Sequence, residues 1–199
     1  MIGMRYFTAI GLFLLFTFPV LAQGWTPMQL AKANTAKDIE LLTDMEKEVI
    51  MYINLCRLYP QEFLEYEVEN YYGTSKYGNY LIRSPYRKSL MRTLNTMEPT
   101  TSLLFDEGAY FSAECFAKEH GKVGRVGHNR IRCEAMNYAE CCSYGMSTAR
   151  DIVLQLLIDH DVPSLGHRRI CLSSAFSVVG VSIQYHSRYG KCAVLDFDW

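Results

Sequence analysis

The most regular feature of the chain is the recurrence of apolar residues every three or four positions, which predicts amphipathic helices. The clearest stripe consists of Phe105, Ala109, Ala113, Phe116 and Ala117. Comparable stripes precede and follow it, and a shorter helix is expected from Ser84-Pro85 to about Thr96. Each of the three main helices lies between a capping residue and a stop signal. The first lies between Thr43 and Pro60, the second between Asp106 and Gly121, and the third between Ser147 or Thr148 and Pro163.

The end of the chain changes to the alternating pattern of β-strands. Apolar and polar residues alternate from Phe176 to His186 and again from Cys192 to Phe197, with a turn between them. A further short strand is expected over residues 135–139, directly before Glu140. Helices followed by a terminal hairpin, without internal repeats, predict an α+β or three-layer domain rather than a doubly wound parallel sheet.

The first 22 residues have the composition of a secretory signal peptide. Arg5 is their only charge, an apolar run extends from Tyr6 to Phe18, and Val20-Leu21-Ala22 fits the small-residue rule for cleavage. This run is shorter than the roughly 20 apolar residues that span a bilayer. We therefore expect an exported protein without a stable membrane span after cleavage, either secreted or located in the periplasm or at the cell surface. A lead-in of residues 23–43 then precedes one domain over residues 44–199.

Charge and cysteine content narrow the range of partners and of covalent pairings. The formal net charge is −1, and the absence of a basic excess argues against nucleic acid as the partner. Seven cysteines in an exported chain predict disulfides, and the odd number leaves at least one thiol without a partner in the same chain. We expect Cys142 to pair with Cys192, and Cys115 to be a buried free thiol on its helix.

The candidate chemistry lies at junctions between loops and regular elements. His128 and His167 each follow a glycine, and Glu140 lies between them in the sequence. Two imidazoles and one carboxylate are the ligand types of a catalytic zinc site that keeps a position open for water. The alternative is a pair of structural histidines, with Glu140 holding backbone N–H groups or a histidine in place. Asp159 is a candidate second acid, or a residue that solvates a helix end.

Other motifs point to no established catalytic class. His160 continues an apolar stripe and is expected in the core, whereas His120 and His186 are expected at the periphery. The chain has no Gly-x-Ser-x-Gly turn, phosphate loop or dinucleotide fingerprint. The tyrosine-rich segment 65–80 is expected to be an irregular loop.

Taken in order, the motifs resemble those of the CAP superfamily (cysteine-rich secretory proteins, antigen 5 and pathogenesis-related proteins), in its bacterial, SCP-like extracellular form. The resemblance covers about residues 44–199. Beside the alanine-rich helix, it is carried by Ile53-Asn54 with Arg57 and Pro60, Gly127-His128-Asn129, Ala139-Glu140-Cys141, Gly166-His167-Arg168 and Val179-Gly180-Val181.

The resemblance implies a three-layer α-β-α sandwich with a mainly antiparallel central sheet. It also implies a large open cleft that holds two histidines and two acids. His128, His167 and Glu140 match three of these positions, and Asp159 lies near the fourth. Members of the family can hold zinc or another divalent ion through the histidines. Cys141 stands where the family usually has asparagine.

From these features we expect an exported domain whose cleft binds a divalent cation, Zn²⁺ or another, and an extracellular lipid, peptide or glycan. One alternative is a zinc-assisted peptidase or cell-wall hydrolase, in which His128 and His167 hold the ion and Glu140 activates water. In that reading Asp159 is the second catalytic acid. Another alternative is a protein-interaction module with a vestigial site, which binds its partner through segment 65–80.

Overall fold

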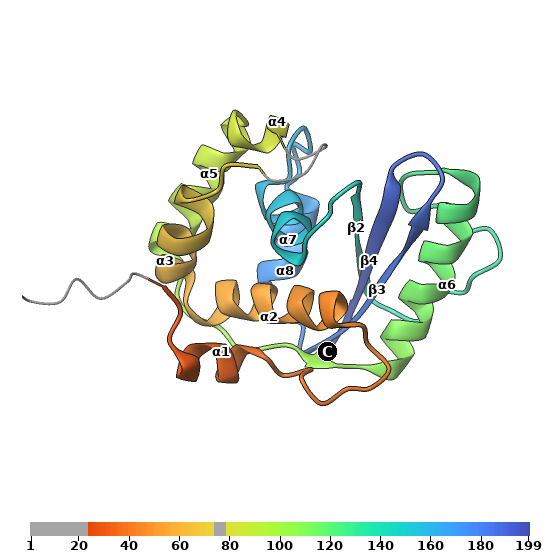
Figure 1. Ribbon diagram of the computed structural model, residues 1–199, viewed down its shortest axis with the longest axis horizontal. Coiled ribbons are helices and arrows are strands. Elements are labelled where there is room, and N and C mark those ends of the chain that lie inside the picture. The colour runs from red at the N-terminus through yellow and green to blue at the C-terminus, as the bar shows by residue number, and fades with distance from the viewer. Residues whose placement is uncertain (1–23, 74–78) are drawn as a thin grey trace, which may run out of the picture.

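The structure, a computed structural model, describes residues 24–73 and 79–199. The expected signal peptide, residues 1–22, and part of the tyrosine-rich segment lie outside the described residues. In the described part the fold is α+β, with helices on both faces of a mixed four-stranded sheet (Figure 1). None of the helices in these ranges combines the length and apolar character that a membrane crossing requires.

The strands lie in the order β1-β3-β4-β2. β3 (Val178–His186) and β4 (Gly190–Asp198) form the antiparallel hairpin that the alternating pattern predicts. β2 (Ala139–Tyr144) extends the sheet antiparallel to β4, and β1 (Leu104–Phe105) joins β3 in parallel. The sheet is therefore mixed, although two of its three strand pairings are antiparallel.

The longest helix and a group of three others cover opposite faces of this sheet (Figure 1). α6 (Glu107–Val123) packs along β3 and β4 on one face. α2 (Asp44–Leu58), α7 (Ala149–Ile158) and α8 (Gly166–Leu172) lie on the other. The remaining helical elements are α1 (Pro27–Ala33), α3 (Pro60–Phe63), the π-helix η1 (Leu64–Glu69), α4 (Asn79–Ile82) and α5 (Pro85–Thr96).

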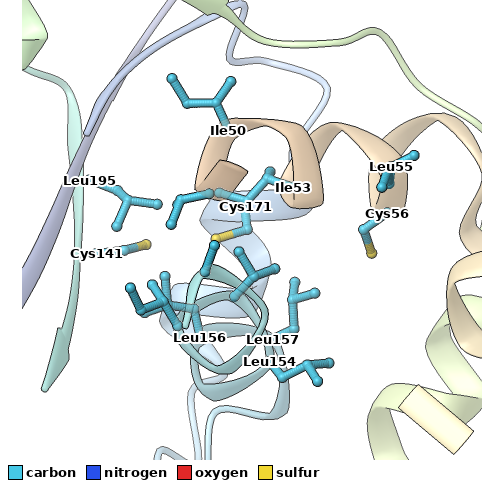
Figure 2. Packing of buried hydrophobic residues seen from close by; sticks show 14 of the residues in the cluster. Ile50, Ile53, Leu55, Cys56, Cys141, Leu154, Leu156, Leu157, Cys171 and Leu195 are labelled. Atoms are coloured by element: carbon cyan, nitrogen blue, oxygen red, sulfur yellow. The ribbon is translucent and has the colours of Figure 1, made fainter. Parts of the chain in front are cut away.

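The larger apolar core fills the space between the sheet and the three-helix layer. Figure 2 shows Ile50 and Ile53 of α2 and Leu156 of α7 packed toward Cys141 of β2 and Leu195 of β4. All five side chains are almost completely buried. Cys141 therefore faces the core, where a polar asparagine would need hydrogen-bond partners.

The contact between α6 and β3 depends on glycine. A Cβ atom at Gly180 would lie 2.0 Å from the backbone nitrogen of Tyr110, and one at Gly121 would lie 1.9 Å from the carbonyl oxygen of Tyr185. Backbone meets backbone at both places, so no larger residue fits. The prediction that Gly121 ends the helix was wrong for this reason. The helix continues to Gly124, whose φ of +70° provides the left-handed cap.

The helix starts were predicted more accurately than the strand bounds. Capping side chains at Thr43, Ser84, Asp106 and Thr148 are confirmed. The strand expected over 135–139 instead begins at residue 139 and contains the predicted acid. The lead-in forms α1 with its own capping box, and Phe105 belongs to β1 rather than to a helix. α7 stops before Pro163, with Asp159 as its C-cap.

A buried arginine connects α2 to the distant chain segments beneath it. Arg57 has no exposed surface, and its guanidinium donates hydrogen bonds to the carbonyl oxygens of Thr101, Cys171, Ser173 and Phe176 at 2.7–3.1 Å. Such bonds satisfy backbone groups that belong to no helix or strand ladder. Arg57 therefore acts as an internal brace between α2, the segment before β1 and the end of α8.

Replacing Arg57 with alanine should lower the free energy of unfolding by about 3 kcal/mol or more, because it leaves several buried carbonyl groups without donors. Urea denaturation measures the change. Arg92→Ala on the exposed side of α5 is the matched control and should change stability by less than about 0.5 kcal/mol. Equal stability of the two variants would contradict the role of Arg57 as a brace.

Candidate functional site

The structure brings the two predicted histidines together at the edge of the sheet. His128 lies in the loop between α6 and β2, and His167 lies in the first turn of α8. Their ring centroids are 5.8 Å apart and their planes are inclined by 36°. His128 is about half exposed and His167 about one-fifth exposed, so solvent reaches both rings.

Each histidine is paired with one of the two predicted acids. The Nδ1 atom of His128 lies 2.8 Å from Oε1 of Glu140, and the Nδ1 atom of His167 lies 2.7 Å from Oδ1 of Asp159. All four residues proposed from the sequence therefore meet at one place, as two histidine–carboxylate pairs. In the His167–Asp159 pair, an acid that accepts a hydrogen bond from Nδ1 directs the Nε2 lone pair outward, which is the usual arrangement behind a metal-binding histidine.

The conformation of Asp159 explains how α7 positions His167. Asp159 is the C-cap of α7, in the left-handed region with φ of 56°, and its carboxylate is almost fully buried. It accepts the backbone N–H of His167 at 3.0 Å and that of Arg168 at 3.3 Å, in addition to the imidazole. Asp159 therefore holds the start of α8 and does not solvate a helix end.

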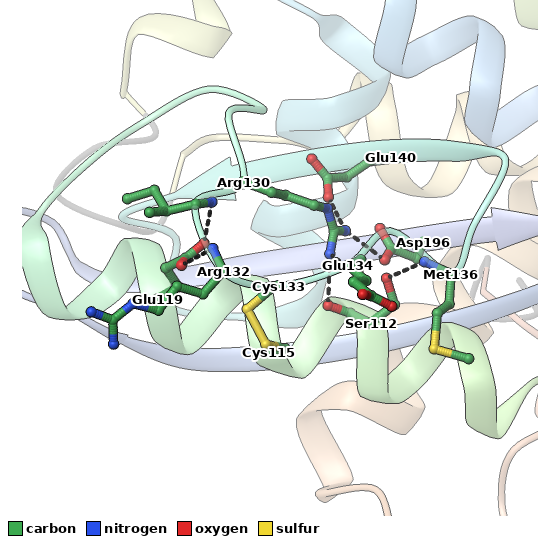
Figure 3. Close-up of a disulfide and its surroundings, with 11 residues drawn as sticks. Ser112, Cys115, Glu119, Arg130, Arg132, Cys133, Glu134, Met136, Glu140 and Asp196 are labelled. Carbon is green, nitrogen blue, oxygen red and sulfur yellow. Dashed lines mark hydrogen bonds and ion pairs between the residues drawn. A yellow bond between two sulfur atoms is a disulfide. The ribbon is translucent and has the colours of Figure 1, made fainter.

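Glu140 is held in turn by an arginine that the sequence reading missed. Its second oxygen forms an ion pair with Arg130, whose guanidinium also lies 2.9 Å from Oδ2 of Asp196 (Figure 3). The same guanidinium donates to the carbonyl oxygens of Ser112 and Glu134. Arg130 thus links the His128 loop, α6 and the strands β2 and β4.

Asp196 is the second residue that the sequence reading missed. It is fully buried, lies opposite Glu140 in the strand register, and its Oδ1 atom has no hydrogen-bond partner among the described residues. Burial raises the pKa of Asp196 to about 7. The sequence does mark Asp196, as a charged residue at an inward-facing position of an alternating, mostly apolar strand. An isolated carboxylate is costly to bury there and needs a partner.

Cys142 completes a group of three donor atoms. Its Sγ atom lies 3.7 Å from Nδ1 of His128 and 3.7 Å from Oε1 of Glu140. These three atoms all lie within 4.8 Å of one another, so a metal ion could be held between them. Cys142 is buried, and burial raises the pKa of its thiol well above the ordinary value. The thiol therefore keeps its proton at neutral pH unless a cation displaces it.

The expectation that the chain forms a disulfide is confirmed, but the predicted pairing of Cys142 with Cys192 was wrong. Cys142 and Cys192 are free and lie on adjacent strands, offset by two positions in the register. Such diagonal neighbours are roughly 7–8 Å apart, farther than a disulfide allows. The bond that forms joins Cys115 to Cys133, with Cα atoms 5.8 Å apart. Cys115 is therefore not a free thiol.

The other histidines also differ from expectation. His120 and His186 are buried rather than peripheral, and their Nε2 atoms lie 2.9 Å and 2.8 Å from the carbonyl oxygens of Asn129 and Arg125. Both hold the first part of the loop that carries His128, on either side of that residue. His160 is partly exposed instead of being packed in the core, and it bonds to Ser84 at 2.9 Å.

Two hollows flank the histidine pair. One, of about 420 Å³, is lined by His128, Arg130, Tyr138 and Glu140 among others. The other, of about 140 Å³, is lined by His167, Cys142 and Asp159 together with Tyr80 and His160. The donor groups are therefore reached from two sides, so that a bound ion could meet a further ligand.

Comparisons with known proteins add no family assignment. No protein-family model matches the chain, and a search of curated proteins gives no significant match. The functional argument therefore depends on the geometry of the site and on the order of its motifs.

The hydrogen bond to Glu140 raises the pKa of His128. Glu140→Gln should therefore lower that pKa toward the ordinary value of 6.5, as measured by NMR titration of the imidazole in the presence of a chelator. A raised pKa means that folded protein holds the proton more tightly than unfolded chain. The pair thus stabilises the fold below about pH 6.5 and loses this contribution as pH rises through the raised pKa.

The matched control is Glu134→Gln, a change of the same kind at an exposed position of the same loop. It should leave the titration of His128 unchanged. An unchanged or higher pKa of His128 in Glu140→Gln would show that the ion pair does not govern this histidine.

Proposed function

We propose that this chain is an exported CAP-like domain that binds a divalent cation, with zinc as the preferred ion, and presents it to an extracellular ligand. The observation that carries the proposal is the convergence of His128, Glu140 and Cys142 within 4.8 Å. His167 faces this group and is proposed as a fourth ligand. Imidazole, carboxylate and thiolate are the three protein ligand types that zinc accepts.

The separations of the donor atoms suit a zinc ion. Zinc binds sulfur at about 2.3 Å and nitrogen at about 2.0 Å, so two tetrahedral ligands of these kinds lie roughly 3.5 Å apart. The Sγ atom of Cys142 and Nδ1 of His128 are 3.7 Å apart. The Nδ1–Oε1 distance of 2.8 Å between His128 and Glu140 is that of the hydrogen bond which a metal would replace.

Two side chains behind the donor groups hold these donors in place, which favours tight binding of the ion. Arg130 fixes Glu140, and Asp159 fixes His167, through ion pairs that are mostly shielded from water. Groups behind the ligands typically account for 10–100-fold in metal affinity. Arg130 and Asp159 thus have positioning roles in this proposal, and His128, His167, Glu140 and Cys142 have binding roles.

The hydrolase alternative is less well supported. A water-activating base needs a free carboxylate oxygen, yet Glu140 binds Arg130 through one oxygen and His128 through the other. Cys142 is a protonated, buried thiol and so a weak nucleophile. These contacts favour a binding function for the cleft.

The CAP-like architecture is proposed on the order of the motifs and on the helices that flank both faces of the sheet (Figure 1). Export is proposed on the composition of residues 1–22, and the Cys115–Cys133 disulfide is compatible with an oxidising compartment. The extracellular ligand is proposed to be a lipid, peptide or glycan that enters the hollows beside the two histidines.

Isothermal titration of zinc into metal-free protein should show one site. Cys142→Ser and His128→Ala should each weaken binding by about 100-fold or more, because each removes a direct ligand, and loss of a group that only holds a ligand in place can reach about that value. Cys192→Ser and His160→Ala are the matched controls, since they change a buried cysteine and a partly exposed histidine outside the donor group. Equal heats in all five proteins would contradict the proposal.

Zinc affinity should also increase with pH between about 6 and 8. Both the His128 imidazole and the Cys142 thiol have a raised pKa, so each must release a proton before it binds the ion. Titrations in two buffers of different ionisation enthalpy measure the protons released. An affinity that does not change with pH would mean that neither group is a ligand.

A further inference from the structure

A hollow separate from the two beside the histidines lies on the outer side of α6, over the disulfide. It has a volume of about 540 Å³ and is formed by α6 and the loop that follows it. Lys118, Lys122 and Arg132 line it together with Val123 and Ile131. None of its lining residues belongs to the hollow beside His128.

The positive charges around this hollow are largely unneutralised. Lys118 forms an exposed ion pair with Glu114 at 2.8 Å. Among the described residues, the side chains of Lys122 and Arg132 have neither a hydrogen bond nor an ion pair. The carboxylate of Glu119 also lines the hollow and accepts the N–H groups of residues 131 and 132 at 2.9 and 2.8 Å (Figure 3). The pKa of this carboxyl is lowered by the hydrogen bond from Ile131 and also by the charge of Arg132. Three cations and one carboxylate thus line the hollow. The hollow is therefore cationic on a protein whose net charge is −1.

Aliphatic side chains are exposed beside these cations. Val123 and Ile131 are 56% and 55% exposed, and Val126, between them in the sequence, is 50% exposed. Single exposed aliphatic residues are common and need no explanation. A group of them around one cationic hollow, in contrast, is typical of an interaction surface.

This surface is held in place before any partner arrives. The Cys115–Cys133 disulfide fastens the loop to α6, as Figure 3 shows. The contacts of Glu119 with the loop backbone and of His120 with the carbonyl oxygen of Asn129 add to it. A partner would therefore not have to order the loop on binding.

We propose that the surface formed by Lys118, Lys122, Val123, Ile131 and Arg132 docks on an anionic lipid bilayer. Cationic heads on long aliphatic stems reach lipid phosphates, while neighbouring aliphatic side chains enter the boundary of the acyl chains. Nucleic acid is a poorer match because no aromatic ring that could stack on bases lines the hollow. This docking function is additional to cation binding and does not depend on it.

Sedimentation with lipid vesicles tests the proposal. The protein without its expected signal peptide, residues 23–199, should bind vesicles of phosphatidylglycerol mixed with phosphatidylcholine, and much less those of phosphatidylcholine alone. Each cation near an anionic surface contributes about fivefold in partitioning, so the double variant Lys122→Glu and Arg132→Glu should lose roughly 25-fold or more. The double variant Val123→Ser and Ile131→Ser should also weaken binding, while keeping its salt dependence.

The control makes the same charge change on another part of the molecule. Lys88→Glu with Arg92→Glu alters two exposed cations on α5, which Figure 1 shows at the opposite end of the fold from α6. It should retain binding within about threefold of the unchanged protein, allowing for the change in net charge. Circular dichroism checks that every variant is folded.

Three results would overturn the proposal. The first is equal binding to vesicles with and without phosphatidylglycerol, and the second is an equal loss in the control on α5. The third is loss of binding when a chelator is added, since this would assign the membrane contact to the cation site. Vesicle binding that survives the chelator supports the docking surface even if the zinc titrations are negative.

Discussion

One guanidinium group determines the shape of the candidate site. Arg130 lies between the carboxylates of Glu140 and Asp196 and also binds backbone carbonyl groups of α6 and of its own loop. These bonds join the long segment between α6 and β2 to the sheet, together with the contacts of His186 with Arg125 and of Tyr144 with Gly127. A buried cation between two acids is costly unless all its partners are present, so the arrangement holds as a unit. It places His128 opposite His167, which α7 and α8 position independently through Asp159.

Much of the fold could be predicted from local patterns in the sequence. Helix caps such as Thr43 and Asp106 act over one turn, and the terminal hairpin alternates over its own length, so a single segment contains the information. The convergence of His128, Glu140 and His167 was expected from the resemblance of their motifs, which also placed Asp159 near the fourth position of the site. The roles of Arg130, Asp196 and Cys142 were not expected, because they depend on which strand lies beside which.

The predictions that were wrong also depend on which segments lie beside one another. Gly121 has the signal of a helix stop, but it is a glycine because β3 lies against it, and the true cap is Gly124. The cysteines carry no pairing information in the sequence, and register alone separates Cys142 from Cys192. The same register places Glu140 opposite Asp196, so that Arg130 binds both carboxylates.

In the proposed site, a cation replaces the proton shared by His128 and Glu140 and takes Cys142 as a ligand. X-ray absorption at the zinc edge of the loaded protein tests this directly, because sulfur scatters differently from nitrogen and oxygen. The account predicts one sulfur ligand at about 2.3 Å with nitrogen and oxygen ligands at about 2.0 Å, and loss of the sulfur signal in Cys142→Ser. A coordination shell of nitrogen and oxygen alone, identical in both proteins, would contradict it.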